Sequence, residues 1–141
     1  MNSGVFFVDL ALELIKRHEG LRLKPYRCSA GKLTIGYGRN LERGEGISER
    51  EAEELLRNDI LEVCQDLEGY SWYRSATQNR RAALVDLRFE LGAGRFRGFK
   101  KFIAAMAAGD YLLAKVELLD SRYAVQVPNR ANEIANMIEA G

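Results

Sequence analysis

The sequence of 141 residues has few of the side chains that disulfide-stapled or metal-binding domains need. It contains two cysteines, Cys28 and Cys64, and one histidine, His18. The two cysteines lack the spacing of a metal site and do not make the disulfide framework of a small secreted fold. No partner of His18 suggests a catalytic triad or a set of metal ligands. We therefore expect neither a metal ion nor a cofactor.

An excess of one charge and a long apolar run are also missing. The chain carries 21 basic and 20 acidic side chains, a net charge of +1, which provides no global basic field for nucleic acid. No apolar run is long enough to span a bilayer. Residues 1–14 lack a basic segment and a cleavage site, so they do not resemble a cleaved signal peptide. We expect no nucleic-acid partner and no stable membrane span.

The chain does have enough apolar side chains for a compact core. Hydrophobic residues make up 47% of the sequence and charged residues 29%, which is typical of a globular protein. The length fits a single domain, or two closely packed lobes. The sequence has no internal repeats and no low-complexity tracts.

Hydrophobic spacing predicts a small strand region flanked by helices. Apolar residues recur at helical spacing in a first helix over about residues 5–18. Residues 21–37 alternate around a turn at Gly31 and predict two short strands. Ser48 and Glu51 form a capping box that opens a long helix over about residues 49–68.

The rest of the chain predicts helices only. Ser75 and Gln78 suggest a second capping box, before a helix that ends at Gly92 and Gly94. Shorter helices are expected over 99–107, 111–119 and 128–140, with Asp110 as a cap and Pro128 at a first helical position. The predicted fold class is α+β within one domain. It has a β lobe (about 20–47), a linking helix (about 48–68), and a helical lobe (about 69–141) that includes the N-terminal helix.

Glu19 is the candidate catalytic acid. Glycoside hydrolysis needs a carboxylic acid that protonates the leaving oxygen, and usually a second group across the sugar. Such an acid belongs in a partly desolvated cleft wall, where it stays protonated near neutral pH. Glu19 lies where the first helix meets the strand region, at a hinge between the predicted lobes. A cleft between two lobes is a common place for a polymer substrate.

Three sequence blocks carry a family pattern. The first block runs from Glu19-Gly20 through Tyr26 and continues from Gly31 to Thr34-Ile35-Gly36-Tyr37-Gly38. The second block runs from Gln78 to Gly92, and the third from Ser121 to Ala131. In this order, over nearly the whole chain, they resemble the phage-type lysozymes, the endolysins related to phage T4 lysozyme. The resemblance implies a lysozyme-like fold and an enzyme that hydrolyses the β-1,4 bond between N-acetylmuramic acid and N-acetylglucosamine of bacterial peptidoglycan, leading to host cell lysis.

The resemblance also assigns the catalytic roles. Glu19 matches the family's catalytic glutamate, and Thr34 matches a threonine that helps to place the attacking water. Position 28 matches the second catalytic residue, which is an aspartate in many relatives and a cysteine in some; here it is Cys28. A thiol has an ordinary pKa of about 8.5 and is mostly neutral unless a positive neighbour lowers it. Lys32, Arg27 and Arg39 are such neighbours in sequence.

Supporting roles follow from the same resemblance. Arg130 matches an arginine that in relatives lies beside the catalytic glutamate. Asp86 and Glu90 lie on one face of a helix that borders the cleft in the family, where they would bind polar groups of the substrate. Gly36 and Tyr37, from the strand block, complete the supporting set.

Several alternatives remain open at this point. Cys28 is also explained as a small buried hydrophobe, and Thr34 as a β-branched residue chosen for a strand. Without the aspartate, a lytic transglycosylase that forms anhydro-muramyl ends is a rival, as is a non-catalytic peptidoglycan-binding module. The resemblance implies a monomer from a phage or prophage. It would be made in the host cytoplasm, act on the wall in the periplasm, and depend on a holin-type pore or another export route.

Overall fold

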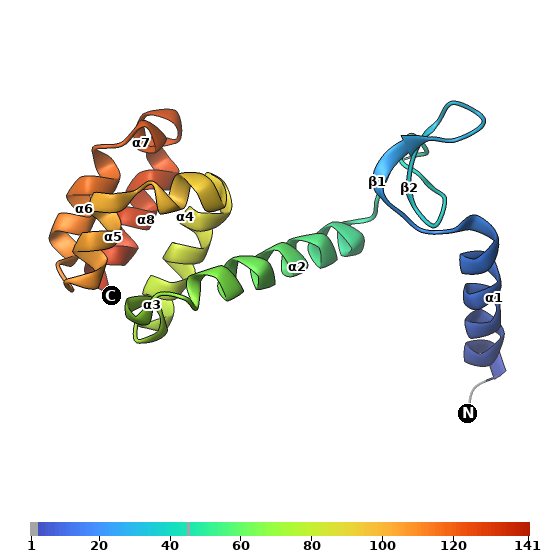
Figure 1. Cartoon of the computed structure of the whole chain (residues 1–141), viewed down its shortest axis with the longest axis horizontal. Coiled ribbons are helices and arrows are strands. Elements are labelled where there is room, and N and C mark those ends of the chain that lie inside the picture. Colours follow the sequence, from blue (N-terminus) through green and yellow to red (C-terminus); the bar gives the residue numbers. More distant parts are fainter. Residues whose placement is uncertain (1–2, 45) are drawn as a thin grey trace. The chain divides into compact units, whose positions relative to one another are not determined.

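The computed structural model describes residues 3–44 and 46–141 (Figure 1). The chain divides into two compact units, Met1–Glu53 and Glu54–Gly141, and each is described by itself. The described residues form eight helices and one three-stranded antiparallel sheet. The predicted α+β fold class is therefore confirmed. The grouping of the N-terminal helix with the helical lobe, and the cleft between lobes, stay predictions.

The first unit begins with helix α1 (Ser3–Glu19), which is longer than expected at both ends. It ends at Gly20, whose φ of 72° is in the left-handed region that glycine adopts at little cost. The N–H group of Gly20 donates to the carbonyl of Lys16 at 3.0 Å and closes the last turn. This glycine therefore fixes Glu19 as the last residue of α1.

A three-stranded sheet follows, in the order β1 (Arg22–Arg27), β2 (Leu33–Gly36) and β3 (Arg39–Asn40). The predicted pair of strands around Gly31 is confirmed, whereas the third strand was not predicted. Thr34 lies on the middle strand, where it pairs with Tyr26 on one side and Asn40 on the other. Backbone pairing on both sides therefore holds Thr34 in place.

Helix α2 (Glu49–Leu67) begins with the predicted capping box. The N–H group of Glu51 donates to Ser48 Oγ at 3.1 Å, and the N–H group of Ser48 donates to Glu51 Oε1 at 3.0 Å. Arg39 Nη1 lies 2.7 Å from Glu51 Oε2. The hydrogen bond from Arg39, followed by those from Ser48, lowers the pKa of Glu51 to about 2.

This arrangement predicts how the stability of the protein depends on pH. The pKa of Glu51 lies below its ordinary value of 4.5, so its stabilising contribution is complete above that pH and is lost as the pH falls towards 2. We expect Glu51→Gln to be less stable than wild type at pH 7, with a difference that shrinks between pH 4.5 and 2. Urea unfolding at a series of pH values measures it, with Glu49→Gln as a control for losing a carboxylate in the same helical turn. A difference that does not change with pH would refute the prediction.

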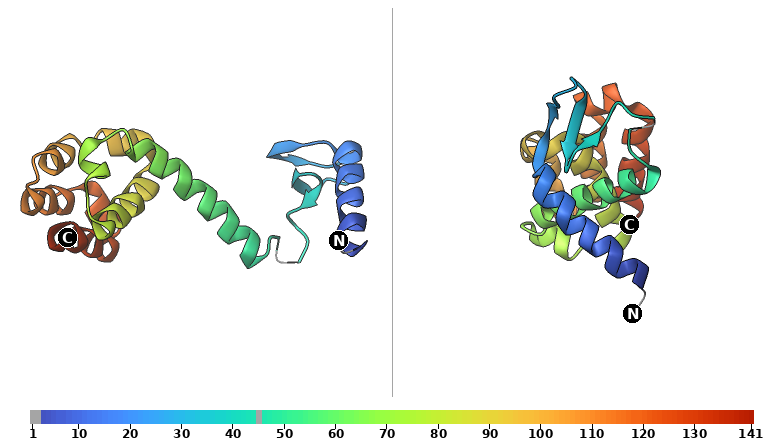
Figure 2. Two further views of the ribbon diagram at one scale, coloured as in Figure 1. Left: turned by 90° about the horizontal axis from the view of Figure 1, so that it is seen from below. Right: turned by 90° about the vertical axis from the view of Figure 1, so that its right-hand side faces the viewer.

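The second unit contains the rest of α2 and six further helices (Figures 1 and 2). These are α3 (Ser71–Arg74), α4 (Gln78–Arg97), α5 (Lys100–Ala107), α6 (Tyr111–Leu119), α7 (Arg122–Gln126) and α8 (Pro128–Ala140). Helix α8 packs against α4, α6 and α7. The largest fully buried side chains lie here, namely Phe96, Phe102, Leu67, Leu84, Leu87, Leu118 and Ile138. This core fixes α4 and α8, which carry the supporting residues predicted from the sequence.

The helix caps of this unit match the sequence with one exception. Asp110 accepts from the N–H group of Leu113 at 3.1 Å, and Pro128 opens α8, both as predicted. The second capping box is wrong, because the N-cap of α4 is Thr77, which accepts from the N–H group of Arg80. Ser75 is instead the C-cap of α3. Gly92, with φ 78° and ψ 164°, interrupts α4 where the helix was expected to end.

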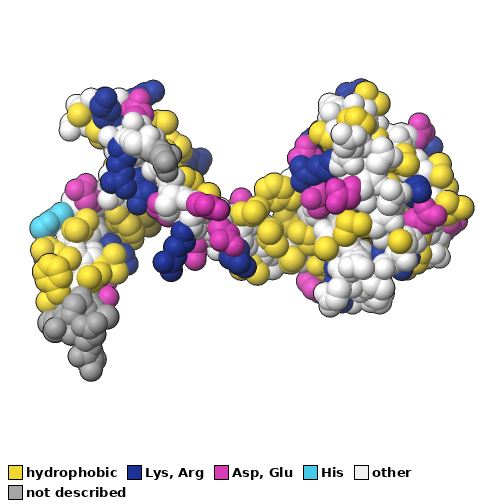
Figure 3. Space-filling model, turned by 180° about the vertical axis from the view of Figure 1, so that it is seen from behind, with side chains coloured by type: hydrophobic (Ala, Val, Ile, Leu, Met, Phe, Trp, Pro, Cys, Tyr) yellow, Lys and Arg dark blue, Asp and Glu magenta, His cyan; other side chains and the backbone are white. Residues whose placement is uncertain are grey.

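Exposed hydrophobic side chains lie on both α1 and α2 (Figure 3). On α1 they include Phe7 and Leu10, and on α2 Leu55 and Leu61, which are 56% and 60% exposed. None of the described helices combines the length and the apolar character needed to cross a lipid bilayer.

Candidate active site

The three predicted catalytic residues lie in the first unit. Glu19 is the last residue of α1, Cys28 is the first residue of the turn after β1, and Thr34 lies on β2. Glu19 is exposed within its unit, Cys28 is half-buried and Thr34 is 3% exposed. The sequence thus brings these three residue types into one compact unit that is built from a helix end, a turn and a strand.

Thr34 is buried behind the turn that carries Cys28. Its Oγ1 donates to the carbonyl of Lys32 at 2.8 Å, and its hydroxyl also contacts the thiol of Cys28. Thr34 therefore fits the strand, where a β-branched side chain is favoured, and at the same time places a hydroxyl beside Cys28. The catalytic role of Thr34 stays a prediction.

The turn after β1 surrounds the thiol of Cys28 with hydrogen-bond donors. The N–H group of Cys28 donates to Lys32 O at 2.9 Å, and the N–H group of Gly31 donates to Cys28 O at 2.8 Å. In this tight turn the backbone N–H group of Lys32, then that of Ala30, donates to the sulfur and lowers the pKa of Cys28 below its ordinary value. The Thr34 hydroxyl acts in the same direction, while partial burial opposes the shift. The turn therefore favours a thiolate.

Two of the three basic neighbours named from the sequence, Arg27 and Arg39, have other partners. Arg27 Nη1 donates to Gly31 O at 3.2 Å and lies 3.6 Å from Glu42 Oε2. Arg39 is bound to Glu51. Glu42 also accepts from the N–H group of Leu33 at 2.7 Å, which ties the base of the turn. Backbone N–H groups thus lower the pKa of the Cys28 thiol, and no residue type in the sequence predicts this effect.

The Thr34 hydroxyl has only one proton to donate. When Cys28 is a neutral thiol, the Thr34 hydroxyl can keep its hydrogen bond to Lys32 O. When Cys28 loses its proton, the hydroxyl gains a charged acceptor, and a charge-assisted hydrogen bond is about twice as strong as a neutral one. Thr34 can therefore respond to the charge of Cys28 by rotating its hydroxyl.

The turn between β2 and β3 contains the supporting residues Gly36 and Tyr37. Gly36 ends β2 with a φ of 70° and pairs with Arg22. The ring of Tyr37 is 40% exposed, and Lys16 Nζ lies 5.7 Å from its centroid. The next residue, Gly38, was not named as a site residue, although a methyl group added there would lie 3.0 Å from Glu19 Oε2. Gly38 therefore borders the carboxylate of the predicted acid.

The supporting residues Arg130, Asp86 and Glu90 meet in the second unit. Arg130 Nε donates to Asp86 Oδ1 at 2.8 Å, and Arg130 Nη1 donates to Glu90 Oε2 at 2.9 Å. The hydrogen bond that Arg130 donates to Asp86 raises the pKa of Arg130, and burial followed by the charge of Asp86 raises the pKa of Tyr123. Each carboxylate uses one oxygen on Arg130, and a carboxylate has capacity for further donors. The expected neighbourhood of Arg130 and Glu19 stays a prediction.

Asp86 and Arg130 also line a pocket within the second unit. Its volume is about 570 Å³, and its other lining residues are Leu56, Ile60, Ala82, Val85 and Phe89. A mostly apolar wall with a few charged groups is the usual composition of a ligand pocket. The cluster around Arg130 is therefore accessible rather than enclosed in the core.

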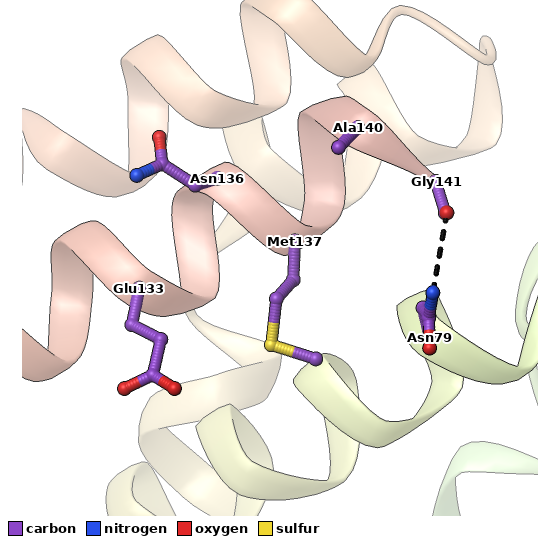
Figure 4. Close-up of a pocket in the computed structure, with 6 residues that line it drawn as sticks. All are labelled: Asn79, Glu133, Asn136, Met137, Ala140 and Gly141. Carbon is purple, nitrogen blue, oxygen red and sulfur yellow. Dashed lines mark hydrogen bonds between the residues drawn. The ribbon is translucent and has the colours of Figure 1, made fainter.

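A second pocket, of about 420 Å³, lies between the start of α4 and the end of α8 (Figure 4). Its lining residues are Asn79, Glu133, Asn136, Met137, Ala140 and Gly141. Asn79 Nδ2 donates to Gly141 O at 3.5 Å, and Arg80 Nε donates to Ile138 O at 2.7 Å. These contacts join the two helix ends, and none of the predicted site residues lines this pocket.

No metal centre is formed among the residues that the structure describes. No group of three or more His, Cys, Asp and Glu side chains there is placed to hold an ion.

Comparisons with known proteins show the family to which the chain is similar. The family model described as phage lysozyme matches residues 16–132. The chain is 40% identical, over 79% of its length and 76% of the relative's, to an endolysin of Acyrthosiphon pisum secondary endosymbiont phage 1. It is 26% identical to the protein named "Probable T4-type lysozyme 2" of Dictyostelium discoideum, over 92% of this chain and 93% of the relative. The matched region includes every predicted site residue.

Proposed function

Because the chain belongs to the phage lysozyme family, we propose that it is an endolysin that hydrolyses the β-1,4 bond between N-acetylmuramic acid and N-acetylglucosamine. As a member of this family it is a lysozyme, an enzyme that acts on bacterial peptidoglycan. The observation that supports the proposal is the first unit, which contains Glu19, Cys28 and Thr34 and in which the turn around Cys28 lowers the pKa of its thiol.

The proposed reaction starts with Glu19 as a carboxylic acid. Glu19 gives its proton to the glycosidic oxygen while the bond from that oxygen to the anomeric carbon breaks. The thiolate of Cys28 stabilises the positive charge that develops on the sugar, or takes a proton from the attacking water. The Thr34 hydroxyl helps to place that water. The water oxygen bonds to the anomeric carbon and completes a new reducing end. The proton that this water loses passes to solvent, either directly or through Cys28, and Glu19 takes up a proton from solvent.

The charge of Cys28 helps to distinguish a hydrolase from a lytic transglycosylase. A lytic transglycosylase works with one acidic residue, because the muramyl 6-hydroxyl replaces water as the nucleophile. Such an enzyme has no need of a second anionic group. The backbone donors around Cys28 lower its pKa and so ease formation of a thiolate, which is why we favour hydrolysis in this proposal.

The proposal includes a place of action. The enzyme is made in the cytoplasm of the host bacterium, reaches the wall through a holin-type pore or another export route, and acts in the periplasm as a monomer. Host cell lysis is the expected outcome. This part rests on the family alone.

Clearing of permeabilised Gram-negative cells tests whether the protein is an enzyme or a binding module. Purified protein is added to the cells and the turbidity is followed, while co-sedimentation with isolated peptidoglycan sacculi measures binding. We expect progressive clearing at low enzyme concentration. Sedimentation with the sacculi but no clearing would instead support a non-catalytic wall-binding module.

A further inference from the structure

The carboxylate of Glu19 lies against the backbone of Gly38. A methyl group built on the Gly38 Cα would lie 3.0 Å from Glu19 Oε2, 3.3 Å from Cδ and 3.7 Å from Cγ. A contact of 3.0 Å is tighter than most contacts that real Cβ atoms make, so a side chain at position 38 would push the Glu19 carboxylate away by a few tenths of an ångström. Gly38 thus leaves open the space that the end of the Glu19 side chain occupies.

A second contact joins the same two segments. Lys16 lies one helical turn before Glu19, and its Nζ is 5.7 Å from the ring centroid of Tyr37, the residue before Gly38. An exposed cation–π contact of this kind is weakly attractive. Tyr37 and Gly38 are adjacent in the turn, and they contact Lys16 and Glu19 respectively. Lys16 and Glu19 are three residues apart and therefore lie on the same face of α1.

A side chain at position 38 would have two distinct effects. The φ of Gly38 is 85°, so any L-residue there is strained by the backbone. The added Cβ would also meet Glu19, and the group that moves most easily is the flexible end of the glutamate rather than the turn. The steric cost would therefore appear as a displaced carboxylate.

We propose that Gly38 is a positioning residue, which holds the Glu19 carboxylate in its working position by leaving only that space open against the turn Tyr37–Gly38. This inference rests on the proposed role of Glu19 as the general acid. A misplacement of about 1 Å in a catalytic group can lower the rate about a hundredfold. Gly38 does not touch the reacting atoms and acts through Glu19 alone.

The test is a double-mutant cycle of Gly38→Ala and Glu19→Ala on the full chain. Because the expected shift of the carboxylate is a few tenths of an ångström rather than 1 Å, we expect Gly38→Ala to lower kcat on peptidoglycan by up to about tenfold, with little change in the substrate concentration at half-maximal rate. In the Glu19→Ala background, Gly38→Ala should change the residual rate no further. It should also cost less free energy of unfolding there, since no carboxylate remains to be displaced.

Gly109→Ala is the matched control for backbone strain. Gly109 lies between α5 and α6 with a φ of 70°, and a methyl group there would have no neighbouring atom within 4 Å. This variant should keep wild-type kcat. A folded Gly38→Ala with wild-type kcat overturns the inference, as does an equal loss of stability in both Glu19 backgrounds or failure to fold in both. If Glu19→Gln is itself fully active, it is the proposed function that fails.

Discussion

Replacement of Glu19 by glutamine is expected to lower the rate of lysis about 10²–10⁴-fold, the usual contribution of a general acid. Glutamine keeps the size and polarity of the side chain but has no proton to give to the glycosidic oxygen. Because Glu19 is an exposed residue at the end of α1, the variant should fold as well as wild type. The initial rate of turbidity loss, together with a thermal unfolding curve, measures both effects.

Glu13→Gln is the control for this experiment. Glu13 lies on the same helix with a side chain that is 76% exposed, and its contact to Lys16 at 4.0 Å is too weak to matter for stability. It should lyse cells at the wild-type rate. Equal clearing by Glu19→Gln and wild type would show that Glu19 is not the acid.

Variants at position 28 should show that a negative charge is needed there. We expect Cys28→Ala to lose about a hundredfold in rate, whereas Cys28→Asp stays active, because aspartate carries the charge that the turn stabilises on the thiolate. The control Cys64→Ala, on α2, should remain active. An Ala variant as fast as wild type would mean that Cys28 is only a small packed side chain.

The pH dependence of the same variants gives an independent measure. Hydrogen bonds from the backbone of Lys32 and Ala30 lower the pKa of Cys28 below its ordinary value of 9.0. The thiolate forms as the pH rises through that lowered pKa, so the wild-type rate should fall on the acid side of it. An aspartate has a much lower ordinary pKa, and Cys28→Asp should therefore keep its rate to lower pH. Identical acid limbs for the two proteins would argue against a thiolate.

Long periodic segments could be predicted from the sequence because packing and spacing agree there. The helices over 100–107, 111–119 and 128–140 match the predicted ranges within one residue. The elements that were missed, α3, α7 and β3, are too short to show a period. The N-cap of α4 was misplaced because Ser75 and Thr77 are both good caps, and Ser75 is already used to end α3.

The candidate site shows a similar division. Glu19, Cys28 and Thr34 could be named through the resemblance to the phage-type lysozymes, and their catalytic roles stay predictions. The contribution of the backbone could not: the N–H groups that face Cys28 belong to Lys32 and Ala30, whose side chains give no sign of it. Gly38 is harder still, because its contact with Glu19 depends on the lack of a side chain. Such contacts are set by the path of the chain and become visible only in three dimensions.

Mass spectrometry of the products from purified peptidoglycan sacculi tests the proposed reaction most directly. Wild-type protein should release muropeptides that end in reducing N-acetylmuramic acid, with one water added for each bond cut, and Glu19→Gln should release almost none. Anhydro-muramyl ends, which are lighter by one water, would identify a lytic transglycosylase, and intact sacculi would rule out glycan cleavage altogether.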